Sequence, residues 1–325
     1  MSNTRREFLM AGAAAGAALS MGGFAQPARA QAIKSLEVFV PAAPGGGWDA
    51  TGRAIEAAMR ADGIMSEFKF EHAPGAGGMT GLPRFINGKK GQGNAVMIGG
   101  MVMVGAGAVA KSPVTIANVT PLARLTGEAM VIVVPEASPH KSIGDLIAAL
   151  KKDPKAVSWA GGSAGGSDHI FAGMLAKSQG VDPRSVAYVA FAGGGPAQAA
   201  LLGNQVTAGV SGYGEFEEQI KAGKLRALAV SGETGQSGVK SLKEQGINVV
   251  LYNWRGVFGA PGISDAQRKE LIGLFDKMVA GPSWKKTLET RGWDGIYLSG
   301  DAYGKYVTEE IGRITGILKE LGLAA

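Results

Sequence analysis

The sequence contains no cysteine. It therefore has no disulfide framework, no cysteine nucleophile and no thiolate metal site. Histidine is also scarce, since His72, His140 and His169 are the only three. The chain offers little material for a zinc site, and we expect no bound metal and no cofactor.

Charge and long apolar runs are sparse as well. Charged residues make up 18% of the chain, below the roughly 25% of an average globular protein. The net charge of +6 is dispersed, and no basic stripe is interleaved with aromatic residues, so we expect no nucleic-acid partner. The uncharged stretch 95–110 is too short and too rich in glycine for a membrane span of about 20 residues. A buried strand that turns into a buried helix fits it better.

The first thirty residues have the order of an export signal. Arg5 and Arg6 form a twin arginine before a weakly apolar stretch rich in alanine and glycine, and Ala28-Arg29-Ala30 is a small-x-small cleavage site. This order predicts a twin-arginine signal peptide over 1–30, cleaved near Ala30. We expect the remaining chain to reside in the periplasm.

Short apolar runs alternate with helical patterns over most of the rest. This repetition indicates sheets with parallel strands and helices on their faces. About ten strands are expected, more than one open sheet holds comfortably, so the sequence predicts two α/β domains. We place the crossings between them near 130–134 and 250–254. Domain 1 would then comprise 31–131 plus 254–325, and domain 2 would comprise 132–253.

Glycine is abundant where other residues are scarce. It supplies 52 of the 325 residues, about twice the usual share of roughly 7%. Four clusters each follow a predicted strand and precede a predicted helix, at 44–49, 74–78, 161–167 and 193–196. Glycine lets a backbone approach a ligand closely, and a helix N-terminus presents free N–H groups and a positive dipole end. The clusters therefore indicate an anion-binding site, although each alone could be a tight packing turn.

Two of these loops match catalytic motifs. Gly45, Gly47 and Ala50 fit G-x-G-x-x-A, with Glu71 about 20 residues further, as in dinucleotide-binding folds. An exported NAD(P)-dependent oxidoreductase is therefore the alternative function. The loop around Ser163 fits G-x-S-x-G, but only His169 follows it, inside the next helix, which argues against a hydrolase triad. We expect no catalytic residues and no enzyme activity.

Several segments resemble the solute-binding proteins of tripartite tricarboxylate transporters, also called the Bug family. The resemblance covers nearly the whole chain after residue 31 and rests on VPAAPGGGWDATGR (40–53), HAPGAGGMTG (72–81), VSWAGGSAGGSDHI (157–170), VAFAGGGPAQAALLGNQVTAGVSGYGEF (189–216) and GKLRALAV (223–230). It implies a two-domain periplasmic binding protein of type II-like architecture, in which each domain is a mixed sheet flanked by helices. It also implies an organic acid, delivered to a membrane permease. The Gly-Gly-Gly-Trp-Asp form resembles the branch associated with citrate-like tricarboxylates, so a tri- or dicarboxylate is favoured. We expect the receptor to be a monomer.

The resemblance and the glycine loops together give a set of candidate ligand-binding residues. Backbone N–H groups from the first domain would hold one carboxylate, at Gly46, Gly47, Gly75, Ala76 and Gly77. The second domain would meet another carboxylate with Ser163, Gly166 and Ser167. Further candidates are Trp48 and Tyr213 as walls, His169 as a ligand contact or a structural histidine, and Gly194.

Asp49 is ambiguous, because its charge repels an anion. It either caps the helix that follows, or orients water and accepts from a ligand hydroxyl. Arg53, one turn into that helix, is expected to form a surface or interdomain ion pair rather than to clamp a carboxylate.

Overall fold

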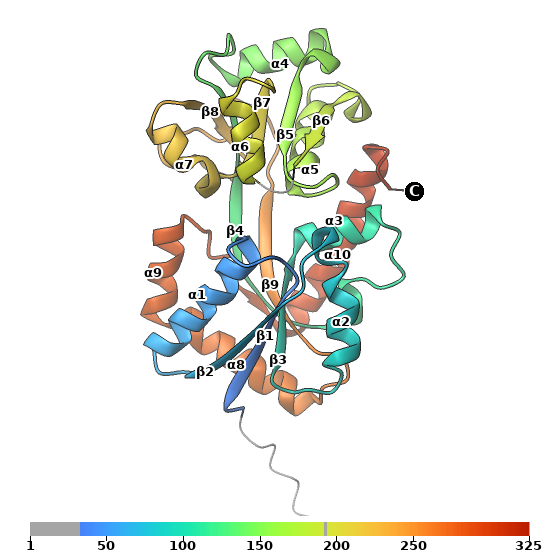
Figure 1. Cartoon of the computed structure of the whole chain (residues 1–325), viewed down its shortest axis with the longest axis vertical. Coiled ribbons are helices and arrows are strands. Elements are labelled where there is room, and N and C mark those ends of the chain that lie inside the picture. Colours follow the sequence, from blue (N-terminus) through green and yellow to red (C-terminus); the bar gives the residue numbers. More distant parts are fainter. Residues whose placement is uncertain (1–32, 192–193, 325) are drawn as a thin grey trace, which may run out of the picture. The chain divides into compact units, whose positions relative to one another are not determined.

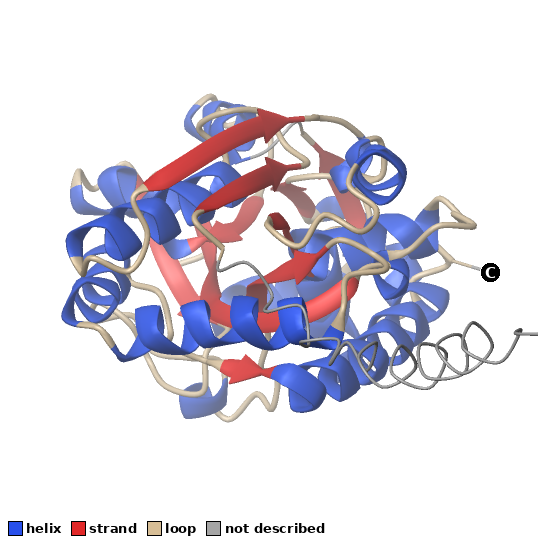
Figure 2. Ribbon diagram, turned by 90° about the horizontal axis from the view of Figure 1, so that it is seen from below, coloured by secondary structure: helices blue, strands red, loops and turns tan. Residues whose placement is uncertain are grey.

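The computed structural model describes residues 33–191 and 194–324, so the predicted signal segment 1–30 lies outside the described residues. Residues from Ile33 onward cluster as one compact unit. Within it, ten strands form one continuous mixed sheet, in which parallel and antiparallel pairs both occur. In Figure 2 the strands lie in the interior with helices around them. The architecture is α/β.

The first half of the sheet combines the N-terminal strands with two that come late in the chain. β1 pairs in parallel with β2 and β3, while β9 is antiparallel to both β3 and β4, and the short β10 pairs with β4. The strands are β1 (Ser35–Val40), β2 (Glu67–His72), β3 (Ala95–Gly100), β4 (Thr120–Pro135), β9 (Tyr252–Gly259) and β10 (Leu298–Ser299). Their helices are α1 (Gly47–Ala61), α2 (Gly81–Gly88), α3 (Met101–Val109), α8 (Asp265–Ala280), α9 (Pro282–Arg291) and α10 (Gly300–Glu320).

The second half of the sheet is built on the far end of β4. There β4 is antiparallel to β7 and β8, and β5 lies parallel to β6 and β7. The strands are β5 (Ser158–Gly161), β6 (Ala187–Ala190), β7 (Ala208–Gly212) and β8 (Leu225–Val230), and the helices are α4 (Ile143–Lys152), α5 (Ser167–Ser178), α6 (Gly194–Leu202) and α7 (Tyr213–Lys221). Figure 1 shows β4 running from one half of the sheet into the other.

The shared strand β4 is buried throughout its second part, and its side chains alternate between two cores. Met130, Ile132 and Val134 belong to the main hydrophobic cluster, whereas Val131 and Val133 belong to a smaller one on the opposite face. This period of two is what a strand covered on both faces requires. The apolar run seen in the sequence is therefore a strand with both faces buried.

Helix starts follow the signals in the sequence. Capping boxes begin α4 and α8, because Ser142 and Ser264 each accept from the backbone N–H three residues on, and Asp145 or Gln267 accepts in return. The stretch 95–110 forms β3 and α3, as expected. Among the described helices, none has the length and hydropathy that a membrane crossing requires.

Candidate functional site

A cavity of about 500 Å³ is lined by loops from both halves of the sheet. The first half supplies the loops after β1 and β2, the second supplies the loop after β5 and the β7–α7 junction, and β9 supplies two residues at the base. Its size is in the range of small-molecule sites. These predicted residues line it: Gly47, Trp48, Gly75, Ala76, Gly77, Ser163, Gly166 and Ser167.

Four other predicted residues do not line it. Gly46 is the N-cap of α1 and does not line the cavity. Asp49 and His169 lie behind their loops, and Tyr213 is 5% exposed and packs in the smaller hydrophobic cluster. Gly194 begins α6.

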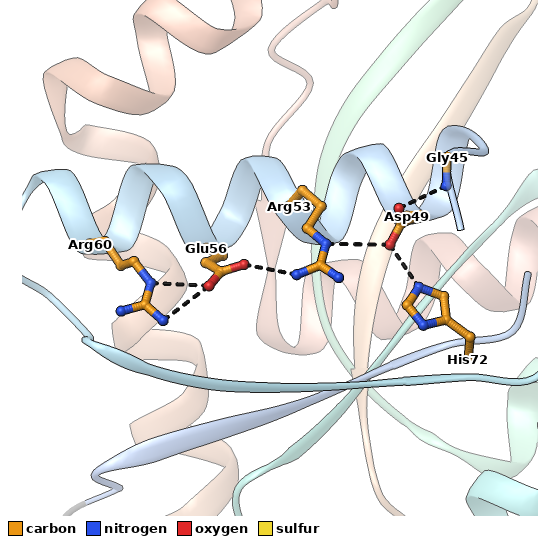
Figure 3. A network of polar contacts seen from close by, with 6 residues as sticks. All are labelled: Gly45, Asp49, Arg53, Glu56, Arg60 and His72. Carbon is orange, nitrogen blue, oxygen red and sulfur yellow. Dashed lines mark hydrogen bonds and ion pairs between the residues drawn. The ribbon is translucent and has the colours of Figure 1, made fainter. Parts of the chain in front are cut away.

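The first glycine loop is held from behind by Asp49, as Figure 3 shows. Gly45 takes a left-handed φ of +84°, and its N–H donates to Asp49 Oδ2 at 2.8 Å. On the other side, His72 Nε2 lies 2.7 Å from Asp49 Oδ1, and Arg53 Nε lies 3.6 Å from the same oxygen. An acidic residue in the first turn also suits the helix dipole. Asp49 therefore fixes the loop through which α1 begins.

Asp49 is ionised despite its burial. Loss of solvent disfavours its charge, but the hydrogen bonds from Gly45 and His72 and the charges of His72 and Arg53 outweigh that effect and lower its pKa. Arg53 also lies over the Phe70 ring, 3.6 Å from its centroid. The predicted ion pair of Arg53 is thus with Asp49 and Glu56, on the surface of α1.

The second loop, 74–78, turns by a run of left-handed residues. Gly75, Gly77 and Gly78 have φ of +131°, +61° and +91°, and Ala76 has +48°. Alanine rarely adopts this region, so Ala76 is strained. A Cβ at Gly77 would lie 2.6 Å from Ala106 of α3, which explains why the loop packs there without a side chain.

These two loops offer unpaired donors. Within the described part of the chain, the N–H groups of Gly47, Gly75, Ala76 and Gly77 donate to no protein acceptor. Gly47 is the first residue of α1, so its N–H belongs to the free end of that helix. Such groups bind carboxylates and other anions.

The third loop repeats the first one with different surroundings. Asp168, in the first turn of α5, accepts from Gly162 N–H at 2.7 Å and from the Ser167 hydroxyl at 2.9 Å. It is 7% exposed, and burial raises its pKa to about 6, with Glu215 and Glu128 adding repulsion. Asp168 lines the cavity, so this loop presents a carboxyl group as well as a helix N-terminus.

His169 supports this loop from within. Gly165 N–H donates to its Nδ1 at 3.3 Å, and the ring stacks on Tyr188 with centroids 4.1 Å apart. Burial lowers the pKa of His169 to about 4, so it is neutral at physiological pH. The Tyr188 hydroxyl in turn donates to Gly162 O at 2.9 Å.

A buried ion pair lies at the base of the cavity, and sequence reasoning missed it. Arg255 of β9 donates to Glu128 of β4, and their side chains are 6% and 9% exposed. A Cβ at Gly47 would lie 2.8 Å from Arg255 Nη2, and one at Gly212 would lie 2.1 Å from Glu128 Oε1. The guanidinium thus contacts the first loop, and the carboxylate contacts the N-terminus of α7. The sequence did offer one indication of this pair, because Arg255 is the one charged residue within the otherwise largely apolar strand β9.

Three further lining residues also escaped sequence analysis. Ser211 and Glu215 lie at the β7–α7 junction, and Asn253 lies on β9. Ser211 donates to Glu215 Oε2 at 2.7 Å. Among the described residues, no three His, Asp or Glu side chains gather in a way that could hold a metal ion.

Comparison with known proteins identifies the family. The model described as "Tripartite tricarboxylate transporter family receptor" matches residues 65–323. The chain belongs to this family. The predicted solute-binding receptor, as opposed to an enzyme, is thereby confirmed, and the oxidoreductase alternative has no support from the comparisons.

Individual relatives agree with this assignment. The chain is 26% identical to the "UPF0065 protein in gbd 5'region" of Cupriavidus necator, over 98% of both chains. A TctC solute-binding protein from Polaromonas is 26% identical, with a TM-score of 0.70 over 89% of this chain and 99% of that one. MatC of Rhodopseudomonas palustris, solved with bound malate, is 21% identical, with a TM-score of 0.72 over 88% and 99%. These neighbours confirm the fold of a periplasmic binding protein.

Proposed function

We propose that this receptor binds an organic acid in the cavity, with a carboxylate held by the loops of the first half. The observation that carries this proposal is the set of unpaired N–H groups at Gly47, Gly75, Ala76 and Gly77, all on residues that line one cavity. A carboxylate satisfies several such donors at once, and the N-terminus of α1 adds a favourable dipole. Arg255, whose guanidinium uses one N–H on Glu128, supplies the cationic charge beside them.

Malate, bound in the R. palustris relative, is consistent with a ligand of this class. For this chain a di- or tricarboxylate remains the expectation from the sequence. Ser163 and Ser167 of the third loop are proposed to contact its second polar group. Ser163 is exposed in the cavity, and Ser167 begins α5.

We further propose that the two halves of the sheet act as two domains that close on the ligand. The boundaries would be 31–131 plus 254–325 and 132–253, with β4 and β9 as the crossings. The receptor would act as a monomer in the periplasm, after cleavage near Ala30, and would deliver its ligand to the membrane permease of a tripartite tricarboxylate transporter.

Thermal unfolding of the purified protein tests the ligand class. The protein is first freed of carried-over ligand by partial unfolding and dialysis, then mixed with citrate, tricarballylate, succinate, malate, glutamate, terephthalate or neutral sugars. A ligand at one hundred times its Kd stabilises the folded state by about 2.7 kcal/mol, which raises Tm by several degrees in a chain of this size. At least one acid should do so, and the sugars should not.

A matched pair of variants locates the site. Ser163→Ala combined with Ser167→Ala should weaken binding of the responding acid about tenfold or more. Ser178→Ala, at the other end of α5, where the hydroxyl donates to Leu175 O and accepts from Gln179 Nε2, should leave binding unchanged. A response to sugars alone would exclude the carboxylate function.

A further inference from the structure

The cavity wall contributed by the second half of the sheet carries an open carboxylate. Glu215, in the first turn of α7, lines the cavity: part of the residue is open to solvent, whereas its carboxyl group is partly desolvated by its neighbours. Its Oε2 accepts from Ser211, while Oε1 receives no hydrogen bond from the described residues. One oxygen is therefore available to a hydrogen-bond donor from a ligand.

The charges around Glu215 are unbalanced. Its acidic neighbours are Glu128 and Asp168. Desolvation is the main cause that raises the pKa of both Asp168 and Glu215, and repulsion by Glu128 adds to the rise in each. Arg255 is the cation close to Glu215, and it already forms an ion pair with Glu128. One guanidinium is thus shared by Glu128 and Glu215, while Asp168 adds a third carboxyl group to the same wall. A ligand carboxylate placed against this wall would be repelled, whereas a donor would be attracted.

Asn253 adds an independent indication. It lines the same cavity, and its Oδ1 is buried with no hydrogen-bond partner among the described residues. A buried amide oxygen without a donor costs free energy. A donor on the ligand would recover that cost once the amide turns toward it.

We propose that Glu215 accepts a hydrogen bond from a donor on the ligand, an ammonium or a hydroxyl group, while the glycine loops hold the carboxylate. This rests on the proposed function and narrows it. The receptor then selects amino- or hydroxy-carboxylates over the unsubstituted acids. Because the wall carries excess negative charge, an ammonium group binds it more strongly than a hydroxyl group.

Calorimetric titration with matched acids tests this selection. Three series differ only in the substituent next to one carboxylate: propionate, lactate and alanine; succinate, malate and aspartate; glutarate, 2-hydroxyglutarate and glutamate. In the series that binds, we expect the amino acid to bind at least tenfold more tightly than the unsubstituted acid, with the hydroxy acid between them. Tightest binding by the hydroxy acid would support a hydrogen bond from the ligand to Glu215, but it would contradict the stated preference for an ammonium group.

A charge-neutral variant assigns the selection to one residue. Glu215→Gln keeps the size of the side chain and an oxygen for Ser211, and it should reduce the preference for the substituted acid at least fivefold. Glu218→Gln, an exposed glutamate on the same helix α7, is the control and should preserve that preference.

These experiments distinguish failure of the donor proposal from failure of the proposed carboxylate function. If some carboxylate binds but no substituted acid binds better than its parent, or if Glu215→Gln leaves the preference unchanged, the donor proposal is wrong and the carboxylate function stands. If no carboxylate in either panel binds, the proposed function is wrong, and this inference falls with it.

Discussion

The first and third glycine loops use the same local device in opposite electrostatic surroundings. In each, an aspartate in the first turn of a helix folds back to accept an N–H of the preceding loop, Asp49 from Gly45 and Asp168 from Gly162. Asp49 is flanked by His72 and Arg53, and its pKa is lowered. Asp168 is buried beside other carboxyl groups, and its pKa is raised to about 6.

This difference separates the roles of the two loops. The charge of Asp49 is compensated behind the loop, so the cavity face of the first loop presents backbone donors alone. The charge of Asp168 is uncompensated and borders the cavity itself. The same sequence pattern, glycines followed by an aspartate, therefore builds a donor surface in one half and an acidic surface in the other.

Removal of the arginine at the base of the cavity, compared with the one beside Asp49, should produce the largest contrast. Arg255→Met leaves Glu128 buried without its partner, which should lower the free energy of unfolding by about 3–5 kcal/mol. Arg53→Met is the matched change at the first loop, where the side chain is 49% exposed, and it should cost only about 1 kcal/mol. Urea denaturation at pH 7 measures both. Equal losses would mean that the two environments do not differ as described.

The pH dependence of stability should distinguish the two aspartates next. A raised pKa means that folded Asp168 holds its proton to higher pH than the unfolded chain does. Its contribution to stability therefore falls as pH rises from about 4 to about 6. The pKa of Asp168 is about 6 in the folded protein and about 4 in the unfolded chain. This difference corresponds to a change of about 2–3 kcal/mol in the free energy of unfolding.

Asp168→Asn removes this titration, so urea denaturation from pH 4.5 to 7.5 should show the variant gaining stability relative to the wild type by up to that amount. Glu215, whose pKa is also raised, contributes a slope of the same sign in both proteins. Glu128 and Tyr188, the other titratable groups that interact with Asp168, are also present in both proteins. Asp49 behaves oppositely, since its lowered pKa gives stability that is lost only as pH falls below about 4. Parallel pH curves for wild type and Asp168→Asn would contradict this assignment.

A smaller effect than that of Arg255→Met or of the Asp168 titration is expected at Asp49 in the first loop. Asp49→Ala removes the acceptor of Gly45 N–H and the partner of His72, and it should cost about 1–2 kcal/mol at pH 7. Asp49→Asn retains an acceptor oxygen for Gly45 and should recover part of that loss. Thermal unfolding of the two variants side by side measures the difference. A loss that is the same for both would show that charge, and not the loop hydrogen bond, is what Asp49 provides.

The sequence predicted those features that depend on neighbouring residues. Serine three residues before Asp145 or Gln267 signals a capping box wherever the chain folds, and both boxes formed. The cavity-lining glycines and serines of three loops were found in the same way, from clusters before helices. By contrast, Leu298 and Ser299 form a strand that is too short to leave a pattern.

Features that depend on pairing between distant segments of the chain could not be predicted from the sequence. Arg255 and Glu128 are 127 residues apart, and they meet because β4 and β9 are antiparallel neighbours, which neither segment reveals alone. Glu215 joins them only because β7 also pairs with β4. Their charges could be read from the sequence, but their mutual distances depend on the order of strands in the sheet.

The shared strand β4 also bears on the order in which the molecule can fold. Its partners are β7, β8, β9 and β10, and the last of these ends at Ser299. Contacts between segments so far apart are closed late, because the entropy of a long intervening loop must be lost first. The pairing of the three N-terminal strands is likewise incomplete until β9, the second neighbour of β3, has been synthesised. The first half cannot complete its sheet from a contiguous piece of chain, so a nascent receptor exposes the edges of β3 and β4 until residues beyond 250 are available.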